Sequence, residues 1–332
     1  MRAAVYSKTG PAKEVLSIVD LPRPEPGQGE VRVRIAWSGV NPSDTKSRAG
    51  TRSPVLPFAQ ISPHSDGAGV IDAVGPGVSK DRIGQNVWLW NAAWGRAQGT
   101  AAEWVVLPEQ QAVLLPANVD LAVGALLGIP ALTAYHAVGL GSGVAGKRIL
   151  VAGGAGAVGH YAVQMAKLAG ARQVIATVSS EAKGKLASAA GADLVLNYRE
   201  GNLAQRVLEA TDGLGVDRII EVDFAANVAV DFAMIAVGGD VVVYGSGQPD
   251  IAVPFVPAIL KNVNIAFFIV YNLSPEDRKR AIVGLTALLE HGALQHNIAA
   301  RLPLARIAEA HEMVESGSAT GNVVVEVQPL LP

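Results

Sequence analysis

The chain has 332 residues, of which half are apolar and 36 are glycine, and it carries a formal net charge of −2. This length predicts two domains that each bury a core, and the glycine content favours an α/β protein with many tight turns. The small net charge argues against nucleic-acid or anionic-membrane partners. The absence of cysteine excludes disulfides, thiolate nucleophiles and cysteine-ligated zinc.

The first residues, MRAAVYSKTG, lack the apolar core and cleavage site of a secretory leader. No uncharged apolar run approaches the roughly 18 residues that span a bilayer. We therefore expect a cytoplasmic protein.

Short β-like runs separated by proline and glycine fill the first 120 residues or so. In VRVRIAW, the apolar residues Val31, Val33 and Ile35 alternate with arginines, which is the period of a half-exposed strand. This part of the chain is therefore predicted to be an antiparallel, β-rich domain.

From residue 123 the pattern changes to apolar runs separated by helix-length segments. Such an alternation predicts a parallel sheet with helices on both faces. The runs are RILVAGG, QVIATV, DLVLN, DRIIEV, DVVVYG and NIAFFIV. Two helix-like segments and a closing strand, NVVVEV, follow them.

The segment VAGGAGAVGHYAVQ places three glycines in the spacing G-x-G-x-x-G between a predicted strand and a predicted helix. Gly154 would permit the tight turn, Gly156 the approach of a pyrophosphate to bare backbone, and Gly159 close packing of helix on sheet. The first helical residues, Ala157 and Val158, would present amides and the positive helix end to phosphate. The pattern predicts a dinucleotide site, and a glycine-rich turn without a ligand is the alternative.

The next predicted strand ends at Val178 and is followed by Ser179 and Ser180. It lacks the carboxylate that holds the ribose diol in NAD-binding proteins. Two hydroxyls with Lys183 nearby suit a 2′-phosphate, because phosphate binds donors and positive charge. The sequence therefore favours NADPH, although Glu181 weakens this interpretation and Lys183 has a solvated helix lysine as its alternative.

Seven segments spread over nearly the whole chain carry a resemblance: SGVNPSDTKSRAG, SDGAGVIDAVGPGV, GIPALTAYHAV, VAGGAGAVGHYAVQMAKLAGA, ADLVLNYRE, GGDVVVYGSG and HEMVESGSATGNVVVEV. In these seven segments the chain resembles the medium-chain dehydrogenase/reductase superfamily and, within it, the zinc-free, zeta-crystallin-like quinone oxidoreductases. The resemblance implies an α/β fold in which a Rossmann doubly wound parallel sheet is joined to a β-rich GroES-like catalytic domain. The implied domains are residues 1–122 (GroES-like), 123–266 (NADP-binding Rossmann) and 267–332 (return to the catalytic domain).

A catalytic zinc would need cysteine or histidine near Asn41 and a histidine just before the GAG turn, where this chain has Ser65. His64 is close, but one histidine with Asp44 and Asp66 is not a convincing ligand set. We therefore expect no metal. Without a Lewis acid, alcohol oxidation is disfavoured, whereas reduction of an electron-poor quinone or enone needs less help.

The resemblance also implies roles for individual residues, although it identifies no catalytic acid. Asn41 and Asp44 would line the nicotinamide ribose side of the substrate cleft, and Thr133 would lie beneath the nicotinamide. Thr133 has helix capping or back-bonding as its alternative. Asn322 stands where the family usually has a lysine near the phosphates, which puts one phosphate contact in doubt.

Tyr198 is similar to the aromatic residue beside the adenosine 2′-phosphate, with cover of the sheet edge as its alternative. The remaining implied contacts follow the fifth and sixth predicted strands, where an open parallel sheet presents its carboxyl end. They are Tyr244, Gly245 and Ser246, and then Phe268, Ile269 and Val270, whose backbone would bind the carboxamide.

These features predict an NADPH-dependent quinone oxidoreductase that passes hydride directly to a small quinone without a metal. The alternative enzyme is an NADPH-dependent reductase of α,β-unsaturated ketones or aldehydes, which the sequence hardly separates from the first. The alternative outside enzymology is a nucleotide-regulated RNA-binding protein, against which the missing basic stripe argues. The resemblance further implies a homodimer through the sheet edge near VVVYGSGQPDIAVPF.

Overall fold

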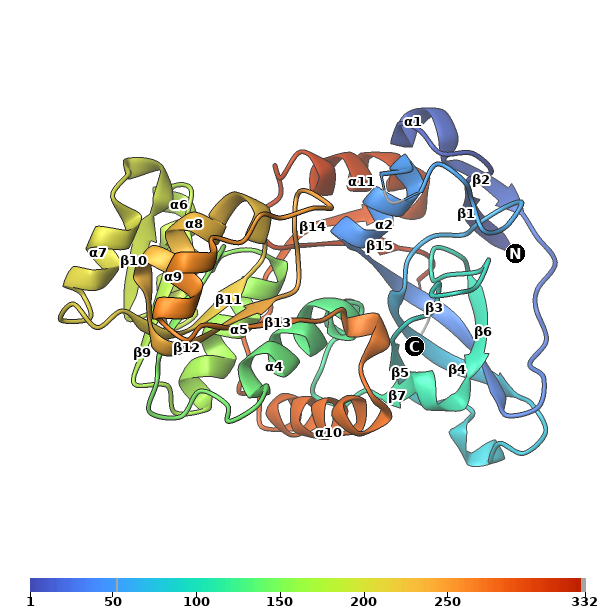
Figure 1. Cartoon of the computed structure of the whole chain (residues 1–332). Helices are drawn as coiled ribbons and strands as arrows, with labels where there is room; N and C mark the ends of the chain where they lie inside the picture. The colour runs from blue at the N-terminus through green and yellow to red at the C-terminus, as the bar shows by residue number, and fades with distance from the viewer. Residues whose placement is uncertain (52, 330–332) are drawn as a thin grey trace. The chain divides into compact units, whose positions relative to one another are not determined.

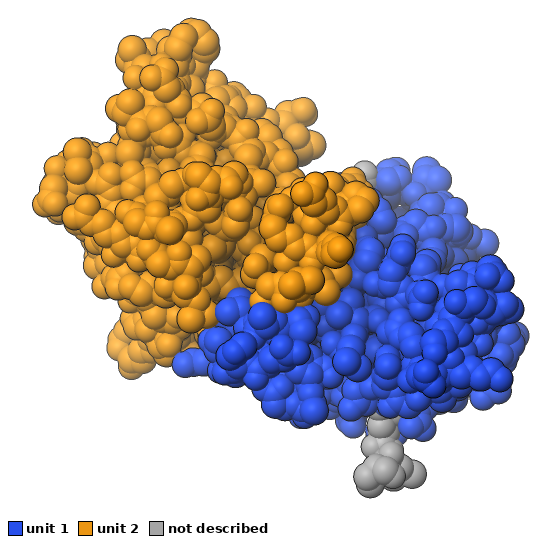
Figure 2. Space-filling model, turned by 90° about the horizontal axis from the view of Figure 1, so that it is seen from below, with its two compact units in different colours: residues 1–129, 286–332 blue, residues 130–285 orange. Residues whose placement is uncertain are grey.

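The structure is a computed structural model that describes residues 1–51 and 53–329. It divides into two compact units, coloured separately in Figure 2: Met1–Ile129 with Thr286–Pro332 (unit 1) and Pro130–Leu285 (unit 2). The sequence-based division into residues 1–122, 123–266 and 267–332 stays a prediction. In the described part of the chain, no helix is long and apolar enough to cross a membrane.

Unit 2 is built on a six-stranded sheet in the order β10-β9-β8-β11-β12-β13 (Figure 1). Every strand pair in it is parallel. In chain order this is 3-2-1-4-5-6, the order of the doubly wound dinucleotide-binding fold. The predicted parallel sheet is therefore confirmed. Its strands are β8 (Arg148–Val151), β9 (Gln173–Val178), β10 (Leu194–Asn197), β11 (Val216–Glu221), β12 (Ile235–Val243) and β13 (Asn264–Phe267).

The helices of unit 2 form two groups. Helix α5 contacts α4 and α6, and in the second group α8 contacts α7 and α9. Helix α5 is buried along most of its length and ends before Gly170, as the sequence predicts. The helices are α4 (Leu132–Gly139), α5 (Ala157–Leu168), α6 (Glu181–Ala189), α7 (Leu203–Glu209), α8 (Phe224–Met234) and α9 (Phe255–Leu260), with short turns η4 (Tyr198–Glu200) and η5 (Val270–Asn272).

Unit 1 contains a sheet in the order β14-β15-β3-β4-β5-β7, with β6 paired to β3, and a small sheet of β1 and β2. All of these pairs are antiparallel except β14 with β15. The predicted β-rich character is confirmed. The strands are β1 (Arg2–Val5), β2 (Ser17–Asp20), β3 (Glu30–Val40), β4 (Asp66–Val74), β5 (Asn86–Leu89), β6 (Trp104–Pro108), β7 (Ala112–Leu114), β14 (Ile298–Pro303) and β15 (Asn322–Glu326).

Short helices complete unit 1, and one long helix crosses the boundary between the units. Unit 1 holds α1 (Ala12–Val15), α2 (Pro42–Ala49), α3 (Leu121–Gly124) and α11 (Ile307–Glu315), with the turns η1 (Lys80–Arg82), η2 (Glu109–Gln111) and η6 (Leu304–Arg306). The segments η3 (Leu127–Ala131) and α10 (Pro275–Glu290) each have residues in both units.

Both ends of the chain contribute to one apolar core in unit 1. Val33 and Ile35 of β3 belong to the same buried cluster as Ile307 of α11 and Val323 and Val325 of β15. Burying these side chains together stabilises the sheet through removal of apolar surface from water. The segment after residue 286 is therefore an integral part of unit 1.

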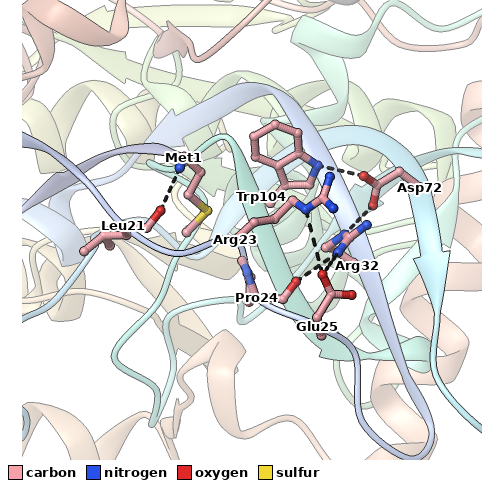
Figure 3. A network of polar contacts seen from close by, with 8 residues as sticks. All are labelled: Met1, Leu21, Arg23, Pro24, Glu25, Arg32, Asp72 and Trp104. Atoms are coloured by element: carbon pink, nitrogen blue, oxygen red, sulfur yellow. Dashed lines mark hydrogen bonds and ion pairs between the residues drawn. The ribbon is translucent and has the colours of Figure 1, made fainter.

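Strand β3 is more buried than its sequence predicts. The alternation predicts a half-exposed strand, but β3 pairs with β4, β6 and β15, and Arg32 is only 6% exposed. The guanidinium lies 2.8 Å from Asp72 Oδ1 and 2.7 Å from Glu25 Oε1. Trp104 Nε1 donates to Asp72 Oδ2 at 2.7 Å (Figure 3). Ion pairing thus allows Arg32 to be buried, although the periodicity of the sequence predicts that it faces solvent.

Candidate cofactor site

The glycine-rich turn joins β8 to α5 in unit 2. Its left-handed residue is Gly153, with φ of 67°, so the tight turn depends on Gly153 and not on Gly154 as predicted. A Cβ on Gly154 would lie 2.6 Å from the Cβ of Ala176 on β9. A Cβ on Gly159 would lie 2.2 Å from the carbonyl oxygen of Gly153. Gly154 and Gly159 therefore both permit close packing of the turn and helix on the sheet.

Gly156 differs from these two because its outer side is open. Apart from its chain neighbours, an added Cβ would meet one described atom within 4 Å, the Gly153 carbonyl oxygen at 3.2 Å. Gly156, Ala157 and Val158 are partly exposed. No described residue accepts a hydrogen bond from the amides of Ala157 and Val158. Bare backbone, free amides and the positive end of α5 together make a surface suited to an anion.

The residues predicted near a 2′-phosphate follow β9 and β10. These strands are parallel with Asn197 opposite Val178, so Ser179 and Tyr198 leave the sheet next to each other. Tyr198 is 48% exposed. Arg199 is exposed beside it but was missed by the sequence analysis. An arginine adjacent to Tyr198 is the signal that sequence reasoning could have used, because guanidinium matches phosphate geometry.

Ser180 is the N-cap of α6, and its Oγ accepts a hydrogen bond from the Lys183 amide at 3.4 Å. A capping hydroxyl keeps its own O–H for donation to an anion. Glu181, which weakens the prediction of NADPH, forms an exposed ion pair with Lys185 at 3.1 Å. Its charge is thus partly balanced within α6, although an exposed pair of this kind is weak.

A cavity of about 660 Å³ lies in unit 2 at the carboxyl ends of β12 and β13. This volume is in the range that holds small ligands. Val270 and Thr133 are both buried and do not line it. The predicted residues that the structure does bring together in its wall are Tyr244, Gly245, Ser246, Phe268 and Ile269. His136 of α4 also lines this cavity, and the sequence analysis did not single it out.

Asn41 and Asp44 lie at the start of α2 in unit 1, where both are buried. The backbone N–H of Asn41 donates to Asp44 Oδ2 at 2.8 Å, and the side-chain Nδ2 of Asn41 donates to Asp66 Oδ2 at 2.9 Å. Asp66 also accepts from the Ile129 amide at 3.1 Å. Burial and then the charge of Asp44 raise the pKa of Asp66 well above its ordinary value. Asp66 therefore fixes the orientation of the side-chain amide of Asn41.

Asn322 is buried at the start of β15. Its backbone amide and its Nδ2 donate to the Asn297 carbonyl oxygen at 3.0 and 3.1 Å. The amide side chain therefore joins β15 to the segment before β14. A short side chain used in this way is a poor replacement for a lysine that reaches a phosphate.

His64, the histidine nearest to the predicted position of a zinc ligand, is fully buried in unit 1. Its Nδ1 lies 2.7 Å from Ser38 Oγ, and its Nε2 lies 2.9 Å from His311 Nε2. Both ring nitrogens thus have partners other than Asp44 and Asp66. Within residues 1–51 and 53–329, no three His, Cys, Asp or Glu side chains are grouped so as to hold a metal ion.

Comparison with known proteins covers both units. Residues 27–117 match the alcohol dehydrogenase GroES-like domain, and residues 157–286 match the zinc-binding dehydrogenase family. A quinone oxidoreductase of Homo sapiens is 34% identical over 331 residues, which cover 98% of this chain and 97% of that protein.

Solved structures give the same result. An NAD-dependent alcohol dehydrogenase has a TM-score of 0.89 and 32% identity, with 99% of this chain and 100% of that chain covered. A mycobacterial protein in complex with NADPH has a TM-score of 0.89 and 30% identity, with 98% and 100% covered. Because the similarity includes both units and nearly the whole length of each relative, the chain belongs to the zeta-crystallin-like quinone oxidoreductases of the medium-chain dehydrogenase/reductase superfamily.

Proposed function

We propose that this chain is an NADPH-dependent quinone oxidoreductase that transfers hydride directly to a quinone without a metal. The observation that carries the proposal is the open backbone at Gly156 followed by the free amides of Ala157 and Val158, at the first turn of a doubly wound sheet. Membership of the quinone oxidoreductase family supports the choice of electron acceptor.

The residues of this chain fit the cofactor in two separate parts of unit 2. The backbone from Gly156 to Val158 would hold the pyrophosphate, and a group of exposed and partly exposed residues after β9 and β10 would hold the 2′-phosphate. That group comprises Ser179, Ser180, Lys183 and Tyr198, to which the structure adds Arg199.

The cavity at the ends of β12 and β13 would hold the nicotinamide half. Tyr244, Phe268 and the backbone of residues 244–246 and 269 line this cavity and would pack against a planar ring. Val270 would act only through its backbone. When bound, NADPH supplies the hydride, and the protein contributes position and a dry site.

The substrate-binding candidates come from both units. We assign Asn41 and Asp44 in unit 1, and separately Thr133 in unit 2, as substrate-binding candidates, with the side-chain amide of Asn41 held in place by Asp66. We assign no phosphate contact to Asn322, since its side chain is bound to the Asn297 carbonyl.

Substitution of Gly156 tests the pyrophosphate assignment. Gly156 has φ of −76°, which other residues adopt freely, so Gly156→Ala should fold normally while placing a methyl group where the pyrophosphate would lie. We expect NADPH affinity, measured by isothermal titration, to fall by about tenfold or more. Gly139→Ala is the matched control, because its Cβ meets nothing within 4 Å. Wild-type affinity in a folded Gly156→Ala protein would refute the assignment.

Comparison of NADPH with NADH tests the 2′-phosphate assignment. We expect NADPH to bind at least about tenfold more tightly, and Lys183→Ala or Arg199→Ala to reduce that preference without changing NADH affinity. Equal affinities for the two cofactors would contradict it and would bring the chain closer to its NAD-dependent structural relative.

Steady-state rates of NADPH oxidation decide the acceptor. We expect a higher kcat/KM with benzoquinone than with cyclohexenone. The reverse order would assign the chain as an enone reductase. Salt-dependent RNA binding that NADPH displaces, with no turnover of either acceptor, would instead assign a nucleotide-regulated RNA-binding protein.

We further propose that the chain forms a homodimer through the edge of the parallel sheet, and that it acts in the cytoplasm. Strand β13 is an edge strand whose partner is β12. Phe267 on this edge and four residues of the neighbouring α9 expose large apolar side chains, more than half of each accessible to water: Phe255, Val256, Ile259 and Leu260. Exposed large apolar side chains of this kind are typical of an interface, and a second copy would cover them.

Charge introduced into this surface tests the dimer. Phe255→Asp with Leu260→Asp should convert the protein to monomers, as measured by light scattering after size-exclusion chromatography. Val283→Asp is the control, because Val283 is an equally exposed apolar residue on α10. A monomeric wild-type protein would contradict the proposal.

A further inference from the structure

The cavity in unit 2 has one deeply buried histidine in its wall. His136 is 6% exposed, whereas the other polar side chains around the cavity are more exposed or already paired. Ser274 Oγ donates to Asp277 Oδ2 at 2.7 Å, and Ser246 Oγ donates to the Gln248 carbonyl oxygen at 2.7 Å. His136 is therefore the buried polar group that this cavity presents to a ligand.

The position of His136 is fixed by its helix and by one aromatic neighbour. It lies three residues after Thr133 on α4, so the two side chains share one helix face. Its ring centroid is 4.7 Å from that of Phe268, at an interplanar angle of 58°. The ring centroid of Phe268 in turn lies 6.4 Å from that of Tyr244. The imidazole thus stands against the aromatic wall of the cavity with a defined ring plane.

The ring nitrogens of His136 have no hydrogen-bond partner among the described residues. Burial lowers the pKa of His136 below its ordinary value, Asp277 acts in the opposite direction, and Arg280 and Arg278 lower the pKa further. The imidazole is therefore neutral at pH 7 and offers one N–H donor and one nitrogen acceptor. A neutral imidazole is a poor proton donor for a reaction, but it is well suited to binding.

We propose that His136 is a binding residue that hydrogen-bonds the carboxamide of a nicotinamide ring placed against Phe268. A primary amide carries both a carbonyl acceptor and N–H donors, so either tautomer of the imidazole finds a partner on it. A neutral ring also avoids repulsion with the positive charge of the oxidised nicotinamide. This inference rests on the proposed function, because it assigns the cavity to the nicotinamide half of the cofactor.

Two ligands separate this inference from the proposed function. NADPH contains the nicotinamide, whereas adenosine 2′,5′-bisphosphate contains only the adenosine end. By isothermal titration, we expect His136→Phe to weaken NADPH binding by about tenfold and to leave binding of the bisphosphate unchanged. His136→Asn keeps a donor and an acceptor and should retain NADPH affinity within about threefold.

The outcomes distinguish a failure of the role of His136 from a failure of the proposed function. Unchanged NADPH affinity in a folded His136→Phe protein overturns the role of His136, and so does an equal loss of affinity for both ligands. Loss in His136→Asn equal to that in His136→Phe also overturns it, because shape and not hydrogen bonding would then be responsible. If the wild-type protein binds neither ligand, the proposed function itself fails. Thermal melting of each variant establishes that it is folded. If one is not, His136→Leu replaces His136→Phe, and His136→Gln replaces His136→Asn.

Discussion

His64 in unit 1 and Asp231 in unit 2 are both fully buried, but only His64 has partners. Thr100 Oγ1 donates to the Asp66 carbonyl oxygen, so Ser38 Oγ must donate to Thr100. His64 Nδ1–H then donates to Ser38, which leaves His64 Nε2 as the acceptor for His311 Nε2–H. The hydrogen-bond chain thereby determines the tautomer of both imidazoles.

Asp231 on α8 has no such chain. Neither carboxyl oxygen receives a hydrogen bond from a described residue. Burial and then the charge of Glu221 raise the pKa of Asp231 to about 8. The difference teaches that this protein accommodates buried polar groups in two ways, by hydrogen bonding at His64 and by neutralisation of the charge at Asp231.

The largest expected effect comes from replacing Asp231. Its folded pKa lies above the unfolded value near 3.8, so the stability of unit 2 is lost as the pH rises between these values. Relative to Asp231→Asn, wild-type protein should lose on the order of 4 kcal/mol between about pH 5 and about pH 8. Hydrogen exchange of the β11 and β12 amides measures this for unit 2 alone. Asp250→Asn, at an exposed site, is the control. If the stability of the wild type, Asp231→Asn and Asp250→Asn changed in parallel with pH, the contrast between Asp231 and His64 would be refuted.

Acid should act on unit 1 in the opposite direction. Burial lowers the pKa of His64 to about 3, so stability is present above the unfolded value near 6.5 and is lost as the pH falls. By about pH 4 we expect a loss of roughly 3 kcal/mol from this group. All five tryptophans lie in residues 1–129, so tryptophan fluorescence during urea unfolding reports unit 1.

His64→Asn provides the test of that assignment. His64 has φ of 78°, a conformation that asparagine tolerates, so the variant should fold. Its stability should be lower at pH 7 and flatter toward acid than that of the wild type. An equally steep acid profile in the variant would show that His64 is not the group responsible.

The smallest expected effect concerns the ion-paired arginine of β3. Arg32→Ala removes a nearly buried guanidinium from Asp72, whose side chain is 26% exposed, and from the exposed Glu25, which should cost about 2 kcal/mol. Arg23→Ala removes a more exposed cation placed 5.7 Å from the centre of the Trp104 ring and should cost less than about 0.5 kcal/mol. Urea unfolding followed by fluorescence measures both. Equal costs would mean that burial of the arginine does not matter.

The parallel sheet and the helix after the glycines were predictable because they depend on local period and spacing. Close packing was correctly predicted for Gly159, but the tight turn was wrongly assigned to Gly154, which instead permits close packing on β9. The left-handed Gly153 was missed because any glycine of the turn satisfies the motif. Spacing therefore indicates the kind of turn and not the conformation of each residue.

The contacts that the sequence could not supply join distant residues. His64 and His311 are 247 positions apart, and no local pattern pairs them. His136 was passed over because one histidine on an apolar helix looks like a core residue until the cavity beside it is known. Arg32 was assigned to solvent because periodicity counts polarity and not the ion pairs that compensate for burial.

The threading of β15 beside β3 has a consequence for biosynthesis. On the ribosome, residues 130–285 emerge as one continuous segment, whereas β3 can pair early with β4 and β6 but gains its third partner, β15, only almost 300 positions later. Until then, the apolar side chains of β3 that share a core with β15 stay partly exposed to water. Chaperones act in this period of translation. Refolding after denaturation should show the same lag, with the dinucleotide-type unit acquiring structure before its discontinuous neighbour.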